Sequence, residues 1–302
     1  MKRRPGFSQR HPLLFGLILL ATAMALMLGA MAFFRGGSGA ARWTRGERLG
    51  VVNVTGVILE SKAVVEFLDE LRKDPGVKGV LLRVNSPGGA IAPSQEIYRA
   101  VRRLAGIKPV VASFGQVAAS GGYYVSAPAT RIVANPGSLT ASIGVKVDYL
   151  DLQGLLADWG VRRELLASGA IKGAGSPFEH LTDAQRKSLM GVVMDMHDQF
   201  VDDVSEARHM DREAVARLAD GSAMTGRQAL AAGLVDELGG FDEALTRLKV
   251  LADVAGEPEL TEGPVKDRSV LERLTGAQGD LGQGLRGLVL DLLPRVQFLY
   301  QQ

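Results

Sequence analysis

The stretch VAASGGYY, residues 117–124, puts a serine among small residues where a predicted strand meets a predicted helix. A serine at the start of a helix is usually a cap. Here Gly121 and Gly122 follow Ser120, and two glycines in a first helical turn cost stability. They would let a substrate backbone approach closely, with the Gly121 N–H beside any oxyanion formed when Ser120 Oγ attacks a carbonyl. The pattern therefore favours a nucleophile over a cap.

A serine nucleophile needs a general base, and a lysine is better placed for this role than a histidine. His180 lies in a predicted loop and His197 in a long amphipathic helix, and neither has the context of a Ser-His-Asp triad. Lys172 is the single charged residue of 167–178, among small and apolar neighbours. Such surroundings favour the neutral amine that a base requires. A solvated loop lysine is the alternative.

Two further loops at predicted strand ends could complete a site around Ser120. The sequence NSPGG, residues 85–89, can turn backbone N–H groups toward an incoming oxygen because of its proline and glycines. A phosphate-binding turn is the alternative, although the Walker pattern is absent. The loop 135–145 contains Ser138 and Ser142, and either hydroxyl could orient the amine of a lysine base.

Strand and helix patterns alternate along the chain, which predicts a largely parallel sheet covered by helices. The apolar run VKGVLLRV predicts a strand buried on both faces. Strands are expected at 49–58, 77–84, 109–114, 131–134, 143–147 and 162–167. Helical spacing predicts helices at 61–73, 94–104, from Ser120 onward, 150–159, 182–208, 211–218, 226–232 and 241–254.

Composition excludes several classes of protein. The chain has 302 residues and no cysteine, so disulfides, thiolate metal sites and cysteine nucleophiles are ruled out. Its four histidines are scattered, and no metal site is predicted. Residues 1–48 hold eight lysines and arginines, whereas the rest of the chain is mildly acidic. This charge distribution is not typical of a nucleic-acid-binding protein.

The basic N-terminal segment surrounds a long apolar run. Residues 13–34 are 22 residues without a charge, a length that spans a bilayer as one helix. Basic residues precede it, which favours a cytoplasmic N-terminus. A cleavable signal peptide is the alternative, because Ala30-Met31-Ala32 resembles a cleavage site. Both interpretations place 36–302 outside the cytoplasm, and we expect a retained anchor.

The far end of the chain is apolar but carries charges. The sequence of 285–299, LRGLVLDLLPRVQFL, predicts a helix packed on the domain or on a partner subunit, interrupted at Pro294. A segment lying on the membrane surface is the alternative.

Taken together, four stretches resemble the signal peptide peptidase A family, in particular its short bacterial members. They are VLLRVNSPGGAIAPSQEIYRAV, VAASGGYYVSAPATRIVANPGSLTASIGV, IKGAGSPF and ADGSAMTGRQALAAGLVDELGGFDEAL. The resemblance covers about residues 50–250. It implies an α/β fold, a crotonase/Clp-protease-like ββα-repeat spiral domain preceded by one N-terminal transmembrane helix. Together with the charge and hydropathy patterns, we expect a basic cytoplasmic tail at 1–12, an anchor at 13–34, a linker at 35–48, a peptidase domain at 49–256 and an amphipathic tail at 257–302.

The resemblance also implies a role for each matching residue. The implied roles are Ser120 as nucleophile, Lys172 as general base, Ser142 as the serine that hydrogen-bonds the lysine, and Gly121 with Gly89 in the oxyanion hole. Whether Gly88 or Gly89 donates to the oxyanion is left open. Two positions depart from the family pattern: Ala141 stands where glycine is common, and Gly173 follows the lysine where a polar residue is common.

The implied function is a membrane-anchored serine endopeptidase that degrades cleaved signal peptides through an acyl-enzyme. The family implies a homo-oligomeric ring in which neighbouring subunits supply the serine and the lysine of one site. The expected location is the bacterial inner membrane, with the catalytic domain on the extracytoplasmic side and no cofactor. Two alternatives are a crotonase-like enzyme that stabilises a thioester enolate, and an inactive scaffold that binds membrane proteins.

Overall fold

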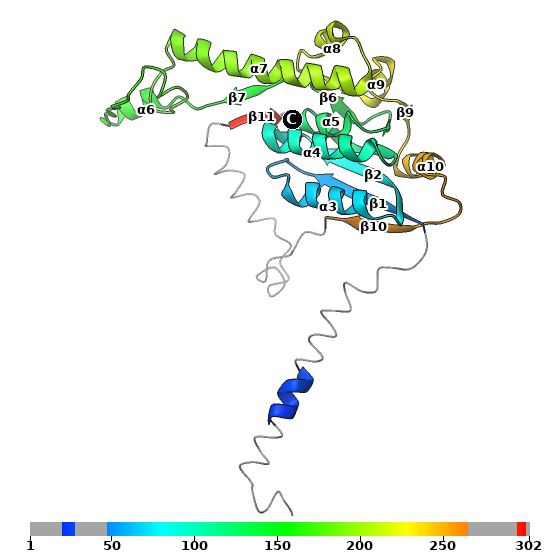
Figure 1. The fold of residues 1–302 in the computed structure, drawn as a ribbon. Coiled ribbons are helices and arrows are strands. Elements are labelled where there is room, and N and C mark those ends of the chain that lie inside the picture. Colours follow the sequence, from blue (N-terminus) through cyan, green and yellow to red (C-terminus); the bar gives the residue numbers. More distant parts are fainter. Residues whose placement is uncertain (1–19, 28–46, 265–294, 300–302) are drawn as a thin grey trace, which may run out of the picture. The chain divides into compact units, whose positions relative to one another are not determined.

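The computed structural model describes residues 20–27, 47–264 and 295–299 (Figure 1). Two compact units are present, Met1–Gly46 and Glu47–Gln302. In the first, residues 20–27 are helical. Within the three described ranges, no helix combines the length and the apolar character needed to cross a membrane. The predicted anchor at 13–34 lies outside the described residues, apart from 20–27.

The larger unit is built on a sheet whose main path runs β10-β1-β2-β4-β5-β9. Every pairing along this path is parallel. A branch, β6, pairs in parallel with β4 and antiparallel with β8. The strands are β1 (Arg48–Thr55), β2 (Val77–Ser86), β4 (Val110–Ala119), β5 (Arg131–Ala134), β6 (Leu139–Ala141), β8 (Ala223–Thr225), β9 (Glu237–Leu238) and β10 (Glu259–Gly263). The expected largely parallel sheet is confirmed.

Helices cover both faces of this sheet, as Figure 1 shows. One face packs against most of the helices, and the other packs against α10. The alternation is visible in β2, where Val80 and Leu82 belong to the first core and Leu81 to the second. The helices are α3 (Lys62–Lys73), α4 (Ile91–Ala105), α5 (Gly121–Ser126), α6 (Gln153–Asp158), α7 (Asp183–Arg208), α8 (Arg212–Leu218), α9 (Gly226–Ala231) and α10 (Phe241–Leu251).

A second, smaller sheet is formed by β3 (Gly88–Ala90), β11 (Arg295–Leu299) and β7 (Lys146–Asp148). β11 is the central strand, and it pairs antiparallel with both neighbours. β3 is the end of the NSPGG turn. This small sheet therefore joins three segments that are far apart in the sequence.

Several predicted elements differ from the observed ones. The strand predicted at 162–167 is absent, since 161–167 form neither helix nor strand and are exposed. An apolar pattern alone cannot supply the neighbouring strand that a ladder needs. Of the strand predicted at 143–147, only residues 146 and 147 are extended, as the start of β7, and 143–145 belong to no helix or strand. The helix predicted at 150–159 is shortened to α6.

The predicted start of α7 is confirmed. Thr182 Oγ1 accepts from the Gln185 N–H at 3.2 Å, and Gln185 Oε1 accepts from the Thr182 N–H at 3.0 Å. This is a capping box. The predicted apolar stripe is buried in the last turns of α7, at Phe200 and Val204. Its earlier part, at Leu189, Val193 and Met196, is half-buried, and nearby Met190 and Met194 are exposed.

The prediction for 285–299 is corrected in its last five residues. Residues 295–299 form β11 rather than a helix, and 285–294 lie outside the described residues. Pro294 directly precedes the strand. The pairing partners of β11 are about 150 and 200 residues earlier in the chain, so local periodicity gave no indication of them.

Candidate functional site

Ser120 ends β4 and precedes α5 in an uncommon backbone conformation. Its φ is 52° and its ψ is −118°, and its side chain makes no capping hydrogen bond. Positive φ is unfavourable for a residue with a Cβ, and such strain is often found at functional sites. The side chain is buried, and Oγ has no hydrogen-bond partner in the described part of the chain. The structure therefore does not use Ser120 as a helix cap.

The two tyrosines after the glycines hold α5 in the core. Tyr123 donates to the Leu234 carbonyl at 3.0 Å, and Tyr124 donates to the Asp203 carboxylate. Burial raises the pKa of both phenols, and the Asp203 contact raises that of Tyr124 further. Both rings are fully buried. These neutral, hydrogen-bonded side chains therefore hold the start of the helix in place, and Ser120 with it.

The NSPGG turn packs directly against the start of α5. A Cβ added to Gly121 would lie 3.2 Å from both Gly88 Cα and Gly89 N. The Gly88 N–H donates to Ser86 Oγ at 3.1 Å, and Gly88 has a φ of 106°. Sequence reasoning did not single out Ser86, although it lies within the NSPGG motif. Glycine is favoured at 121 because the two backbones approach each other closely, and at 88 because of its positive φ.

Gly89 has its N–H and carbonyl on the side of β3 that carries β11. On the opposite side, the Ile58 N–H donates to the Gly88 carbonyl at 2.8 Å, and the Ala90 N–H donates to the Ile58 carbonyl at 2.7 Å. Because peptide groups alternate in direction along a strand, the polar groups of Gly89 face away from Ile58. Gly89 pairs there with Phe298. Of the two glycines, Gly89 is therefore the one whose N–H faces away from Ile58, on the side of β3 where β11 lies. We call this N–H outward-facing.

A substitution at Gly89 should test how tight this turn is. A Cβ at this position would lie 2.1 Å from the Ile58 carbonyl oxygen. We expect Gly89→Ala to lower the free energy of unfolding by about 2 kcal/mol, because backbone on both sides must move. Gly137→Ala is the matched control, since its Cβ would meet nothing within 4 Å, and it should change stability by less than about 1 kcal/mol. Urea unfolding measures the free energy of unfolding of both variants. Equal values for Gly89→Ala and Gly137→Ala would contradict the close packing.

The loop after β6 reaches Ser120 through its backbone. The Ser120 N–H donates to the Ala141 carbonyl at 2.8 Å. Ala141 has a φ of 58° and Ser142 a φ of 50°. The left-handed conformation of Ala141 gives a physical reason for the glycine that is common at this position. This hydrogen bond brings the Ser142 segment next to the Ser120 segment.

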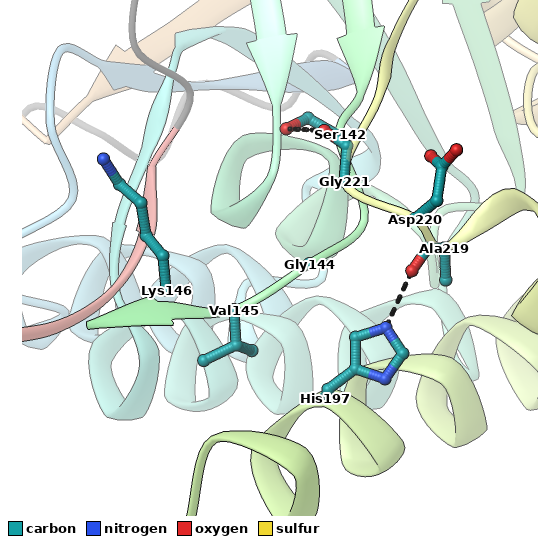
Figure 2. A pocket seen from close by; sticks show the side chains of 8 residues that line it. All are labelled: Ser142, Gly144, Val145, Lys146, His197, Ala219, Asp220 and Gly221. Carbon is teal, nitrogen blue, oxygen red and sulfur yellow. Dashed lines mark hydrogen bonds between the residues drawn. The ribbon is translucent and has the colours of Figure 1, made fainter. Parts of the chain in front are cut away.

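Ser142 and Ser138 have different surroundings. Ser138 Oγ is buried and donates to the Gly115 carbonyl at 2.6 Å. Ser142 Oγ donates to the Gly221 carbonyl at 3.1 Å and lines a pocket of about 310 Å³. Figure 2 shows this pocket between β7, which carries Lys146, and the segment 219–221. Of the two serines left open by the sequence, Ser142 is thus the one beside a cavity.

His197 also lines this pocket, with its ring turned toward the Ala219 carbonyl (Figure 2). Its Nε2 donates to that carbonyl at 2.8 Å, so the imidazole is held by a backbone acceptor. His180 is exposed and pairs with Asp151. Neither ring contacts Ser120 Oγ, which has no partner among the described residues. Across residues 20–27, 47–264 and 295–299, no group of three possible ligands could hold a metal ion.

Lys172 lies in an exposed turn of the segment that joins α6 to α7. The backbone N–H of Lys172 donates to the Gly169 carbonyl at 3.1 Å. Gln185 Nε2 donates to the Ala170 carbonyl at 3.2 Å and ties this segment to the first turn of α7. The single chain does not bring the lysine amine to Ser120 Oγ. It does bring together Ser120, Gly121, Gly89 and the Ser142 loop.

Chemically, this arrangement can support acyl transfer with a serine as the nucleophile. The strained serine stands at a strand-to-helix junction, beside a glycine turn with an outward N–H. Such N–H groups stabilise the oxyanion that forms when a hydroxyl attacks a carbonyl. The general class is therefore that of the serine hydrolases.

Comparison with known proteins specifies the class further. The model of peptidase family S49 matches residues 102–255. A candidate protease of Methanocaldococcus jannaschii is 38% identical over 227 residues, 75% of this chain and 73% of that protein. The candidate signal peptide peptidase SppA of Enterococcus faecium is 42% identical over 187 residues, 61% of this chain and 54% of that protein. Protease 4 of Salmonella typhi is 37% identical over 185 residues, 61% of this chain and 30% of that protein.

The chain belongs to peptidase family S49. It covers most of the Methanocaldococcus protein, about half of the Enterococcus protein and under a third of protease 4. The resemblance found in the sequence is thereby confirmed. The mixed α/β fold with a central sheet is consistent with the expected Clp-protease-like domain.

Proposed function

We propose that this chain is a membrane-anchored serine endopeptidase that degrades cleaved signal peptides through a Ser120/Lys172 dyad. The observation that carries the proposal is the buried Ser120 Oγ, which has a strained backbone and no hydrogen-bond partner within the described residues. A buried hydroxyl without a partner costs about 1–3 kcal/mol. Such a cost is expected where the hydroxyl must stay available to react.

In the proposed mechanism, the neutral Lys172 amine takes the proton of Ser120 Oγ. The oxygen attacks the carbonyl carbon of the scissile bond, and the resulting oxyanion accepts from the N–H groups of Gly121 and Gly89. The leaving amine takes the proton as the bond breaks, which leaves an acyl-enzyme. Water then attacks the ester with the lysine again as base, and Ser120 is regenerated. Ser142, which lines the pocket, hydrogen-bonds the Lys172 amine and orients it.

We assign the lysine of each site to a neighbouring subunit. In one chain, Lys172 is exposed and Ser120 Oγ lacks a partner in the part of the chain described. The segment around Lys172 and the adjoining half of α7 also expose many large apolar side chains. They are Leu150, Leu155, Trp159, Val161, Leu165, Leu166, Ile171, Phe178, Met190, Val192 and Met194. An apolar surface of this kind favours association, and a ring of identical subunits would bring the lysine of one chain to the serine of the next.

The substrate and the location rest on the sequence and on the relatives. The charge-free run 13–34 would hold the catalytic domain at the outer surface of the bacterial inner membrane. Apolar peptides released from the membrane would be close to such a site. The name of the Enterococcus relative, a candidate signal peptide peptidase, points to the same substrate class.

A serine-directed acylating probe tests the proposal against a crotonase-like alternative. We expect a fluorophosphonate to label the wild-type chain at Ser120, located by peptide mass mapping, because the hydroxyl is activated by a base. A crotonase-like enzyme would use the glycine N–H groups without a serine nucleophile and would remain unlabelled. Heat-denatured protein is the control, since an unactivated serine does not react. Absence of labelling in the folded oligomer would overturn the proposal.

A further inference from the structure

Asp203 on α7 is a hydrogen-bond acceptor for Tyr124, the fourth residue after the proposed nucleophile. Its carboxylate accepts from the Tyr124 hydroxyl, and its backbone carbonyl accepts from the Tyr98 hydroxyl at 3.0 Å. Tyr124 is fully buried, whereas Asp203 is half-buried. A carboxylate at the edge of an apolar core loses hydration, and an apolar pair of similar volume would fill the same space. Stability alone therefore does not account for a carboxylate at this position.

The backbone of Tyr124 is bonded directly to Ser120. The Tyr124 N–H donates to the Ser120 carbonyl at 2.8 Å, and the Ser120 N–H donates to the Ala141 carbonyl, also at 2.8 Å. A residue with a φ of 52° and a ψ of −118° keeps that conformation only where its surroundings fix it. The two backbone hydrogen bonds of Ser120 are constraints of this kind, and Tyr124 provides one of them.

The ring of Tyr124 packs against aromatic side chains from two other helices. Its centroid lies 4.8 Å from that of Phe200 on α7 and 4.9 Å from that of Tyr98 on α4. In Figure 1, α7 lies beside α4 and α5. Aromatic contacts tolerate some sliding of one ring past another, whereas a hydrogen bond fixes the position of the hydroxyl. The contact with Asp203 therefore determines where the Tyr124 side chain stands relative to α7.

α7 also contacts the segment that carries the proposed base. In its first turn, Gln185 donates to the carbonyl of Ala170, two residues before Lys172. Asp203 lies 18 residues further along the same helix, which corresponds to about 27 Å at 1.5 Å per residue. One helix therefore contacts the segments of both proposed catalytic residues.

We propose that Asp203 is a positioning residue for Ser120 and that it acts through Tyr124. The hydrogen bond between the carboxylate and the phenol holds the first turn of α5 against α7. The Tyr124 N–H in turn holds the Ser120 carbonyl, and with it the strained backbone that orients Oγ. This inference rests on the proposed function and adds to it a residue on a distant helix that touches no substrate.

A double-mutant cycle tests the link between the two residues. Tyr124→Phe removes the hydroxyl, and Asp203→Ala removes the carboxylate. We expect each to lower kcat for peptide cleavage about tenfold with KM unchanged, because the nucleophile is misplaced while the binding surfaces are intact. Since both act through one hydrogen bond, the double variant should lose no more activity than either single variant. A loss of about a hundredfold in the double variant, the product of two independent effects, would overturn the inference.

Two further variants distinguish positioning from a general loss of stability. Asp203→Asn keeps a carbonyl oxygen as acceptor and should restore kcat to within about threefold of the wild type. Tyr98→Phe is the matched control, because it removes a hydroxyl that is bonded to the backbone carbonyl of Asp203 instead of its carboxylate. It should leave kcat unchanged although it also removes a hydrogen bond in the core. Equal losses of kcat in Tyr98→Phe and Tyr124→Phe would refute the positioning role.

Amide hydrogen exchange separates this inference from the proposed function. Mass spectrometry follows the peptide 121–127, which contains the Tyr124 N–H bonded to Ser120. We expect its amides to exchange about tenfold faster in Tyr124→Phe and in Asp203→Ala than in the wild type or in Tyr98→Phe, because the first turn of α5 opens more often. Exchange needs no catalysis, so this comparison decides the inference even if the chain cleaves no peptide and the proposed function fails. Unchanged exchange in the first two variants would refute the link, and circular dichroism verifies that every variant is folded.

Discussion

Replacing Ser120 by alanine is expected to lower kcat/KM for peptide cleavage by at least about 10⁴-fold, the scale seen when a serine nucleophile is removed. The loss follows because no acyl-enzyme can form without the hydroxyl. The fold should be unaffected, since Ser120 Oγ has no hydrogen-bond partner in the described chain. Because the substitution removes an unpartnered buried hydroxyl, we expect the free energy of unfolding to rise by about 1 kcal/mol or more. Peptidase assays and urea unfolding on the same preparation measure both quantities.

Ser126→Ala is the matched control for this experiment. Ser126 is also buried, and it lies in the same short helix. Its Oγ donates to the Gly122 carbonyl at 2.8 Å, so its removal should cost about 1 kcal/mol of stability and leave cleavage intact. The two substitutions, Ser120→Ala and Ser126→Ala, are therefore expected to have opposite effects on activity and on stability. Cleavage that survives in Ser120→Ala would show that another group attacks the peptide.

Replacing Lys172 by alanine is expected to lower cleavage by about a thousandfold, within the range for loss of a general base. Because we assign Lys172 to the site of a neighbouring subunit, mixing should restore activity. Equal amounts of Ser120→Ala and Lys172→Ala chains, co-expressed with different tags, would form mixed rings. In these, a random quarter of the sites would combine an intact serine with an intact lysine. We expect about one quarter of the wild-type rate in rings that carry both tags.

The mixing experiment also distinguishes a dyad within one chain from a dyad between chains. If both residues came from the same chain, no mixed ring would contain a complete site, and activity would stay at the level of the single variants. Lys62→Ala is the control, because Lys62 is exposed and, among the described residues, its ion pair is a 4.0 Å contact with Glu66. It should retain full activity alone and in mixtures. Retained activity in Lys172→Ala by itself would exclude this lysine as the base.

Local sequence was a reliable guide where short-range chemistry decides the conformation. The apolar run of β2 predicted a strand buried on both faces, and Thr182 with Gln185 predicted the capping box of α7. The close approach of a substrate backbone that the glycines after Ser120 favour stays a prediction, and within the chain Gly121 lies close to the Gly88–Gly89 turn. Each of these features depends on residues that are neighbours in sequence or on sterics that one residue type permits.

Local sequence failed where a segment needs a distant partner. The pattern at 162–167 suggested a strand, but no strand of the described chain pairs with it, and its apolar residues are exposed. The final residues of 285–299 suggested a helix, yet they form β11 between two other segments. Hydrogen-bond ladders are made between segments, so a periodic pattern identifies a possible strand and not its partner.

The amino-acid sequence by itself determined the family, the nucleophile candidate and the isolated lysine, because these are matters of residue type and order. Tertiary structure alone decided that Ser120 is no cap, that Gly89 rather than Gly88 has an outward N–H, and that Ser142 rather than Ser138 lines a pocket. It also decided that β11 lies beside them. The physical reason is common to all four: the surroundings of each group depend on which segments distant in the sequence pack against it, and local sequence does not specify those segments.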